Sequence, residues 1–139
     1  MEKLKQRSLL LINMDDIKNF VDDLGIAAFE ASVKIAGVAI LSDSGNIIFQ
    51  TDNWDLSNES NNILNIVKGS KSIDLNGATF SVIKTTSEGI IATNESGMGH
   101  IIFAPFQGGV LVSYAMAQAD TSIALSFLKS YAMRLSGKI

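Results

Sequence analysis

Short apolar runs separated by turn-forming residues fill the sequence from Ile35 to Ala115. The clearest pair is SIDL and TFSVIKT, because the Asn76-Gly77 dipeptide between them is the strongest short signal for a β-hairpin. The other runs are GVAIL, IIFQT, GIIAT, HIIFA and VLVSYA. Since consecutive strands joined by short turns usually pair with each other, the sequence predicts an antiparallel meander of about seven strands.

A helical pattern precedes these runs. The segment DDIKNFVDDLG begins with aspartates, spaces its apolar residues at i, i+3, i+4 and i+7, and has Gly25 just past the last of them. It predicts an amphipathic helix that begins at Asp15 and stops just before Gly25. The next segment, IAAFEASVK, can continue from it as a second short helical piece. Residues 1–13 show neither pattern, so we interpret them as an N-terminal arm ahead of one domain over residues 14–139.

Two further helices are predicted. The segment DLSNESNNILNIVKG offers a cap at Asp55 or Ser57 and a stop at Gly69, and it reads as a short helix that crosses the sheet. The last segment starts at a cap on Asp120 or Thr121. Its apolar face comprises Ala124, Phe127, Leu128, Tyr131 and Leu135. Because the terminal helices must cover one or both faces of the sheet, the predicted fold class is α+β.

The composition limits the class of protein further. With 139 residues, 47% hydrophobic content and a mean hydropathy of +0.26, the chain fits one globular domain. No unbroken apolar run exceeds Leu9 to Ile12, far short of the roughly 20 residues that span a bilayer. The absence of cysteine excludes disulfides and thiolate chemistry. A net charge of −3 and a pI of about 5.0 argue against a nucleic-acid partner.

The segment ATNESGMGH contains the only histidine of the chain, His100, and two nearby glycines, Gly97 and Gly99. A catalytic histidine needs a nucleophile or a carboxylate partner, and no supporting motif such as Gly-x-Ser-x-Gly is present. A phosphate-binding loop places its glycines before a helix, whereas here a strand is predicted to follow. We therefore interpret the segment as a hairpin turn, with His100 incidental to it, and predict no enzyme activity, catalytic residue, metal or cofactor.

Two other features have more than one interpretation. The pairs Asp15-Asp16 and Asp22-Asp23 lie at the start and on the polar side of a predicted helix, where aspartates cap the helix or face water. Trp54 lies in a polar connection, either as a lid over the sheet edge or as an aromatic anchor for a partner. The residues by themselves thus indicate a small α+β module that binds another protein.

The order of several local strings resembles the profilin family. These strings are FVDDL, VAILSDSGNIIFQ, ILNIVK, GATFSVIK and GMGHIIF followed by GGVLVSYA, and together they span about Asp15 to Leu135. The resemblance implies a profilin-like fold, in which a short middle helix and the N- and C-terminal helices pack on a central antiparallel sheet. The roadblock/dynein light chain family has a similar layout, including an Ala-Pro like Ala104-Pro105, but it usually has five strands and a longer middle helix.

The resemblance implies that the chain binds monomeric actin and thereby controls nucleation and filament growth. Profilins use the end of the middle helix, the outer face of the later strands and the start of the C-terminal helix for this contact. Carried over by position, that surface comprises Lys68, Thr79, Lys84, Thr93, Glu95, Gln118, Ala119, Thr121, Ala124 and Leu128. Lys84 keeps the family's positive charge, whereas Thr93 and Glu95 stand where other profilins often carry basic residues.

Profilins also bind polyproline in an aromatic groove between the terminal helices. Ile17 and Ile48 stand about where tryptophans are expected, and only Phe20 and Tyr131 keep aromatic character. Because proline stretches dock on rigid aromatic faces, the resemblance predicts weak or absent polyproline binding. The pattern is similar to divergent profilins, including archaeal ones that serve actins of their own.

The resemblance also implies a cytoplasmic, cytoskeletal location and names phosphoinositide lipids as a further partner to consider. The alternative to a profilin-like actin regulator is a roadblock-type module that dimerises and serves a small GTPase. A five-stranded sheet paired edge to edge with a second copy would decide for that alternative.

Overall fold

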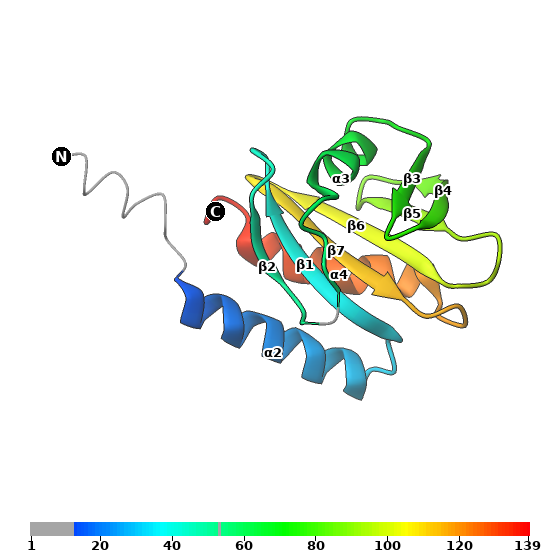
Figure 1. The fold of residues 1–139 in the computed structure, drawn as a ribbon. Coiled ribbons are helices and arrows are strands. Elements are labelled where there is room, and N and C mark those ends of the chain that lie inside the picture. Colours follow the sequence, from blue (N-terminus) through cyan, green and yellow to red (C-terminus); the bar gives the residue numbers. More distant parts are fainter. Residues whose placement is uncertain (1–12, 53) are drawn as a thin grey trace.

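The computed structural model describes residues 13–52 and 54–139 of the chain (Figure 1). Its elements in chain order are α2 (Met14–Glu30), β1 (Ile35–Ser42), β2 (Ile47–Gln50), α3 (Ser60–Val67), β3 (Ser72–Leu75), β4 (Ala78–Thr85), β5 (Ile90–Thr93), β6 (His100–Phe106), β7 (Gly109–Ala115) and α4 (Thr121–Leu135). No helix in this part of the chain is long and apolar enough to cross a membrane.

The strands form one seven-stranded sheet in the order β2-β1-β7-β6-β5-β4-β3, and every neighbouring pair is antiparallel. Strands β3 to β7 are the predicted meander. Strand β1, however, lies beside β7, with Ile40 paired to Leu111, because the segment that contains α3 carries the chain from one edge of the sheet to the other. The α+β class is confirmed, and the seven strands contradict the five-stranded sheet expected of a roadblock-type domain.

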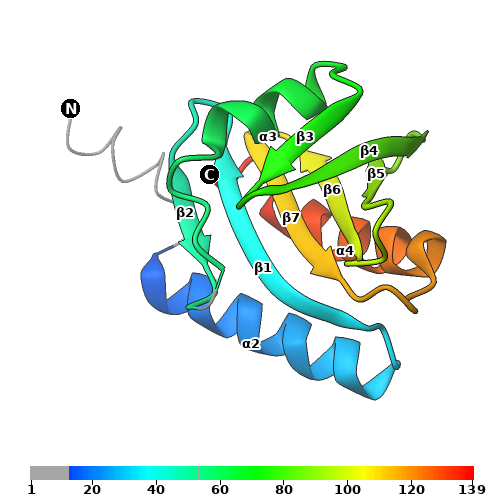
Figure 2. The same cartoon turned by 45° about the vertical axis from the view of Figure 1, so that its right-hand side comes forward.

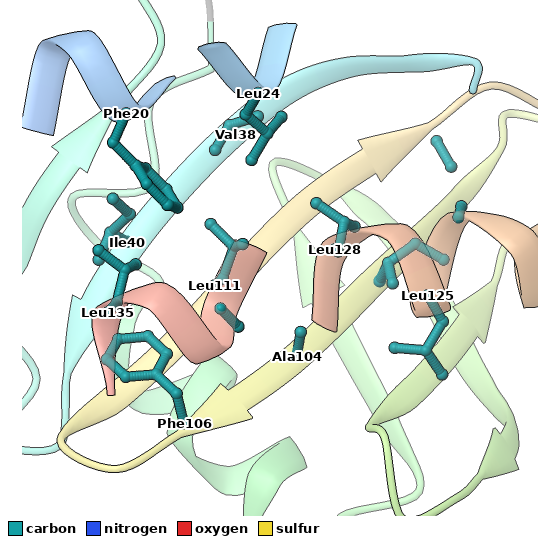
Figure 3. Packing of buried hydrophobic residues seen from close by; sticks show 14 of the residues in the cluster. Phe20, Leu24, Val38, Ile40, Ala104, Phe106, Leu111, Leu125, Leu128 and Leu135 are labelled. Atoms are coloured by element: carbon teal, nitrogen blue, oxygen red, sulfur yellow. The ribbon is translucent and has the colours of Figure 1, made fainter. Parts of the chain in front are cut away.

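The three helices cover the two faces of the sheet unequally. Helices α2 and α4 lie on one face and α3 on the other, as the two views show (Figure 2). Strand β1 follows this division, because Val38 and Ile40 face the terminal helices whereas Ala39 and Leu41 belong to the cluster under α3. Figure 3 shows the cluster between the terminal helices and the sheet. Two separate apolar cores therefore hold the sheet from both sides.

Helix α2 is longer than predicted. It begins at Met14, and Asn13 is its N-cap: the Asp16 amide donates to Asn13 Oδ1 at 2.9 Å, and the Asn13 amide donates back to Asp16 Oδ2 at 3.4 Å. The predicted stop at Gly25 is wrong, because the buried stripe continues from Leu24 to Ala28. The expectation that IAAFEASVK can continue the helix is confirmed as far as Glu30. Of the predicted arm, residues 1–12 lie outside the described part of the chain.

Helix α3 is shorter than predicted. The caps expected at Asp55 or Ser57 are wrong, because the helix starts at Ser60 with Glu59 as an N-cap that makes no side-chain bond. The carboxylate of Asp55 is engaged elsewhere, since its Oδ1 accepts from the amide and the hydroxyl of Ser57 at 2.9 and 2.5 Å. The stop at Gly69 is confirmed: this residue has φ of +118°, which glycine adopts without strain.

The predicted β3–β4 hairpin is confirmed. Asn76 and Gly77 connect the strands with φ of 50° and 86°, the left-handed pair that such a two-residue turn requires. Strand β6 extends through Pro105 to Phe106, beyond the end of the predicted run HIIFA. The proline is tolerated there because the last pair between β6 and β5 joins Phe103 to Ile90, so one side of Pro105 has no neighbouring strand.

Candidate functional site

The terminal helices leave part of their sheet face uncovered. Helix α4 packs mainly on β6 and β7, with few contacts to β5, so that β4 extends beyond it. Phe80 and Val82 of β4 pack in the cluster under α3, and the alternate side chains therefore point to the face of the terminal helices. The pair of Ser81 with Thr93 places Thr93 on that same polar face.

The start of α4 borders this polar face. Lys84 Nζ donates to Ser122 Oγ at 3.3 Å, which connects β4 with the first turn of the helix. The helix begins at Thr121, as predicted, because Asp120 Oδ1 accepts from the Ile123 amide at 3.1 Å. Seven of the predicted contact residues are exposed or half-buried along this border, and we call them the β4–α4 surface: Thr79, Lys84, Thr93, Glu95, Gln118, Ala119 and Thr121.

Two hollows extend the β4–α4 surface. One, of about 450 Å³, lies between the β3–β4 turn and the β5–β6 turn, and both Thr79 and Glu95 line it. The other, of about 460 Å³, lies where α3 meets β4, and its lining includes Lys68, Lys71, Ile83 and Lys84. The structure therefore joins Lys68, which is distant in sequence, to Lys84 through a shared hollow.

Ala124 and Leu128 do not lie on this surface. Both side chains have 0% exposure and belong to the core between α4 and the sheet, where Figure 3 shows Leu128. The helical spacing places both on the apolar face of the last helix, and the resemblance to profilins places both in the actin contact. Their burial is compatible only with the first role. We therefore omit both from the candidate contact surface.

Sequence reasoning did not single out the apolar side chains at the edge of this surface. Ile83 is 61% exposed, Ile123 is 58% exposed, and Val67 lines the same hollow as Ile83. Ile83 lies where the pairing of β4 with β5 shifts between Val82 and Lys84, and this β-bulge interrupts the alternation of the strand. A periodic pattern contains no signal for such a bulge, whereas the exposed position of Ile123 follows from the helical spacing.

The segment ATNESGMGH forms the end of β5, a turn and the start of β6, as predicted. Asn94 is buried and fixes the turn: its Oδ1 accepts from the amides of Ser96 and Met98, and its Nδ2 donates to the Thr79 carbonyl at 2.8 Å. Gly99 has φ of +127° and passes close to Ala115 O. The turn is thus a rigid part of the sheet beside β4.

His100 has two hydrogen-bond partners, a threonine hydroxyl and a backbone carbonyl oxygen, and neither of them is a carboxylate. Its Nδ1 lies 2.8 Å from Thr93 Oγ1, and its Nε2 lies 3.1 Å from the carbonyl oxygen of Ala117. Within residues 13–52 and 54–139, no group of three His, Cys, Asp or Glu side chains could hold a metal ion. The surroundings of His100 are therefore those of a structural bridge.

The groove between the terminal helices retains two aromatic residues, but their faces are occupied. Phe20 is buried and meets Tyr131 edge to face, with ring centroids 5.8 Å apart. The Arg134 guanidinium lies over both rings, at 5.3 Å from the Phe20 centroid and 5.0 Å from that of Tyr131. It also pairs with Asp23 at 3.9 Å across the groove. A cation therefore covers the rings that a proline stretch would need.

The two aliphatic positions of this groove belong to the core. Ile17 is buried and Ile48 is half-buried, and both pack in the cluster under α2 and α4. Trp54 lies on the opposite face of the sheet. Its ring packs on Gly37 of β1 and meets Tyr114 of β7 edge to face at 6.4 Å, which favours the interpretation as a lid over that of a partner anchor.

Known proteins similar to this chain carry one family name. No family model matches the chain. Among curated proteins, Odin profilin of Odinarchaeota yellowstonii (strain LCB_4) is 32% identical over 73% of this chain and 86% of its own length. Loki profilin-1 of Lokiarchaeum sp. (strain GC14_75) is 28% identical over 90% of this chain and 98% of its own length.

A solved structure supports the same relation. The chain superimposes on Loki profilin 1, in a crystal structure of its complex with rabbit actin, with a TM-score of 0.80 and 28% identity. The match covers 91% of this chain and 98% of that one. The similarity therefore extends over nearly the whole chain.

Proposed function

This chain belongs to the profilin family, and we propose that it binds monomeric actin and regulates actin polymerisation. The observation that carries the proposal is the similarity, over nearly the whole chain, to a profilin whose solved structure is a complex with actin. A protein that occupies one face of an actin monomer competes with the contacts between monomers. We therefore expect this protein to slow the spontaneous nucleation of filaments.

The β4–α4 surface is the proposed contact. Its edge has the composition of a protein interface, because exposed Ile83 shares a hollow with Lys84, and exposed Ile123 follows Ser122, which Lys84 contacts. Lys68 and Lys84 around one hollow give this end of the surface a positive charge that suits acidic side chains on the partner. Glu95 adds a negative charge at the other end, next to Thr79, so partners with different charge patterns are discriminated.

Polyproline binding is proposed to be weak or absent. Proline stretches bind to the open faces of rigid aromatic rings, and here Arg134 lies over the rings of Phe20 and Tyr131. Ile17 and Ile48 supply no aromatic face in their place. The protein would then act on actin monomers without recruitment to proline-rich segments.

Phosphoinositide lipids are a second proposed partner. Lys68, Lys71 and Lys84 share the hollow between α3 and β4, and clustered lysines attract anionic headgroups. Sedimentation with vesicles that contain phosphatidylinositol bisphosphate, compared with neutral phosphatidylcholine vesicles, tests this proposal. Equal recovery with both kinds of vesicle would contradict it. Such a partner, like actin, is consistent with a place in the cytoplasm near the cytoskeleton.

Actin assembly kinetics test the main proposal. Actin from the same cell, and separately rabbit muscle actin, is polymerised with increasing amounts of the full chain, and filament mass is followed by the fluorescence of a labelled actin. We expect the lag before assembly to lengthen with the amount of protein added. Assembly curves that stay unchanged at high molar excess with both actins would contradict the proposed function.

A further inference from the structure

His100 connects three segments of the fold through the two nitrogens of its ring. The residue itself begins β6, where its backbone pairs with Thr93 of β5 on one side and with Ala115 of β7 on the other. The ring then reaches the Thr93 hydroxyl at 2.8 Å and the Ala117 carbonyl at 3.1 Å. Ala117 belongs to the connection between β7 and α4, so the ring bridges the sheet to the segment that leads into the last helix.

The two partners determine which nitrogen carries the proton in the neutral ring. The carbonyl oxygen of Ala117 can only accept a hydrogen bond, so Nε2 must be the nitrogen that donates. In this tautomer Nδ1 has a free lone pair and accepts from the Thr93 hydroxyl. Both nitrogens are therefore used, and the Thr93 bond holds the plane of the ring in the orientation that the Ala117 bond needs.

The segment that His100 reaches has little other support from packing. Met116, Ala117 and Gln118 are all exposed, so few apolar contacts restrict them. Backbone bonds hold its ends, from the Met116 amide to Lys34 O and from the Ala119 amide to Met116 O, each at 2.9 Å. The bond from His100 ties the middle of this segment to β6, next to Gln118 of the β4–α4 surface.

We propose that His100 is a positioning residue: by holding the Ala117 carbonyl, it keeps Gln118 and Thr121 in the arrangement that contacts actin. This inference rests on the proposed function and deepens it. The same bridge gives Thr93 an indirect role, because its hydroxyl orients the imidazole ring. His100, which the sequence pattern presents as incidental to the turn, thus supports the binding surface without contacting actin itself.

Two substitutions separate the Ala117 bond from the Thr93 bond. In His100→Gln, the longer side chain can place an amide N–H near the position of Nε2 and keep the bond to Ala117 O. In His100→Asn, the amide oxygen lies near the position of Nδ1 and can accept from Thr93, but the side chain is too short to reach Ala117. The asparagine variant therefore removes only the bond on which the proposal depends.

The affinity for monomeric actin is measured for the full chain and both variants, with thermal unfolding as a check on folding. We expect His100→Asn to weaken binding about fivefold, the effect of one lost neutral hydrogen bond, and His100→Gln to stay within about twofold of the native chain. Equal affinity of all three proteins would overturn the proposal. Equal weakening by both variants would also overturn it, because the retained Ala117 bond would then have no effect.

A second measurement does not depend on actin. Hydrogen exchange of the Ala119 amide, which donates to Met116 O, should be faster in the free His100→Asn variant than in the native chain and in His100→Gln. Unchanged exchange in the asparagine variant would show that His100 does not hold the segment and would overturn the proposal. If the native chain itself leaves actin unaffected, the proposed function and the role in presenting residues to actin fail together. Exchange rates then decide separately whether the bridge orders the segment.

Discussion

The ammonium group of Lys84 on β4 donates a hydrogen bond to the hydroxyl of Ser122 in the first turn of α4, with 3.3 Å between Nζ and Oγ. This contact joins residues 38 positions apart in the sequence and closes the β4–α4 surface at one end. The N-terminus of a helix carries a partial positive charge, to which Lys84 adds a full one. We therefore expect this corner of the surface to meet a carboxylate of the partner.

Charge reversal at Lys84 is expected to weaken actin binding. Lys84→Glu places a negative charge where the surface favours an acidic partner group, so we expect a loss of affinity of about tenfold. The measurement is the protein concentration that halves the rate of actin assembly. Lys18→Glu is the matched control, because Lys18 is an exposed lysine of α2 outside the β4–α4 surface. An equal effect of both variants would point to net charge as the cause, and the assignment of the surface would fail.

Leu128→Ala and Gln118→Ala are expected to distinguish a residue of the core, which affects stability, from a residue of the surface, which affects actin binding. Leu128 is fully buried, so its truncation should lower the free energy of unfolding by about 2–5 kcal/mol. Gln118 is exposed, so its truncation should change stability by less than about 0.5 kcal/mol while weakening actin binding. Denaturant unfolding, followed by the fluorescence of the single tryptophan, measures the free energy of unfolding of both variants. Actin assembly kinetics measure the binding of Gln118→Ala. A Leu128 variant of native stability would contradict the core assignment.

Two glycine-to-alanine substitutions should change stability in opposite directions. A Cβ at Gly37 would lie 2.9 Å from Trp54 Cε3, so Gly37→Ala should lower the free energy of unfolding by about 1–3 kcal/mol and shift the tryptophan emission. Gly25 lies inside α2 with nothing within 4 Å of its added Cβ. Gly25→Ala should therefore raise the free energy of unfolding by about 0.5–1 kcal/mol. A loss of stability in both variants would contradict the continuous helix through Gly25.

The pKa of Asp55 is expected to depend on Ser57. The hydroxyl and then the amide of Ser57 stabilise the charged carboxylate and hold its pKa below the ordinary 3.8. The folded chain favours the charged form of Asp55, so the hydrogen bonds from Ser57 stabilise the fold at pH values above the ordinary pKa. This stabilisation is lost as the pH falls through the lower pKa that Asp55 has in the folded chain. Ser57→Ala should raise the pKa of Asp55 toward its ordinary value, as measured from the pH dependence of the carboxyl carbon signal. An unchanged titration would contradict the role of the hydroxyl.

Calorimetric titration with a ten-residue proline peptide tests the groove between the terminal helices. We expect no saturable heat, because Arg134 lies over the rings of Phe20 and Tyr131. A saturable titration in the micromolar range that disappears in Tyr131→Ala would show that the groove opens to the ligand, and the proposal of weak or absent binding would be wrong.

Most of the local structure could be predicted from the sequence. The Asn76-Gly77 turn, the stop at Gly69 and the start of α4 after Asp120 are determined by side chains within a few positions of each feature. The predicted stop at Gly25 is wrong because the continuation of the helix depends on tertiary burial and not on neighbouring side chains. An isolated glycine costs a helix about 1 kcal/mol, and the burial of Leu24 and Ala28 compensates for it.

The candidate surface could be predicted only in part. The resemblance to profilins supplied its position, but burial removes Ala124 and Leu128 from it, and the bulge in β4 adds Ile83. The hydrogen bond between His100 and Ala117 could not be predicted either, because Ala117 lies 17 residues further along the chain. A contact of this kind depends on how neighbouring strands pair, and a single sequence contains no direct signal for that pairing.

By itself, the sequence determined the type and order of the elements, because helical period, strand alternation and turn residues act over a few positions. Only the tertiary structure decided that β1 lies beside β7 and that Lys84 meets Ser122. Only the tertiary structure decided that His100 bridges Thr93 and Ala117. These relationships join distant parts of the chain, and they arise when two faces of one twisted sheet are buried under helices at the same time.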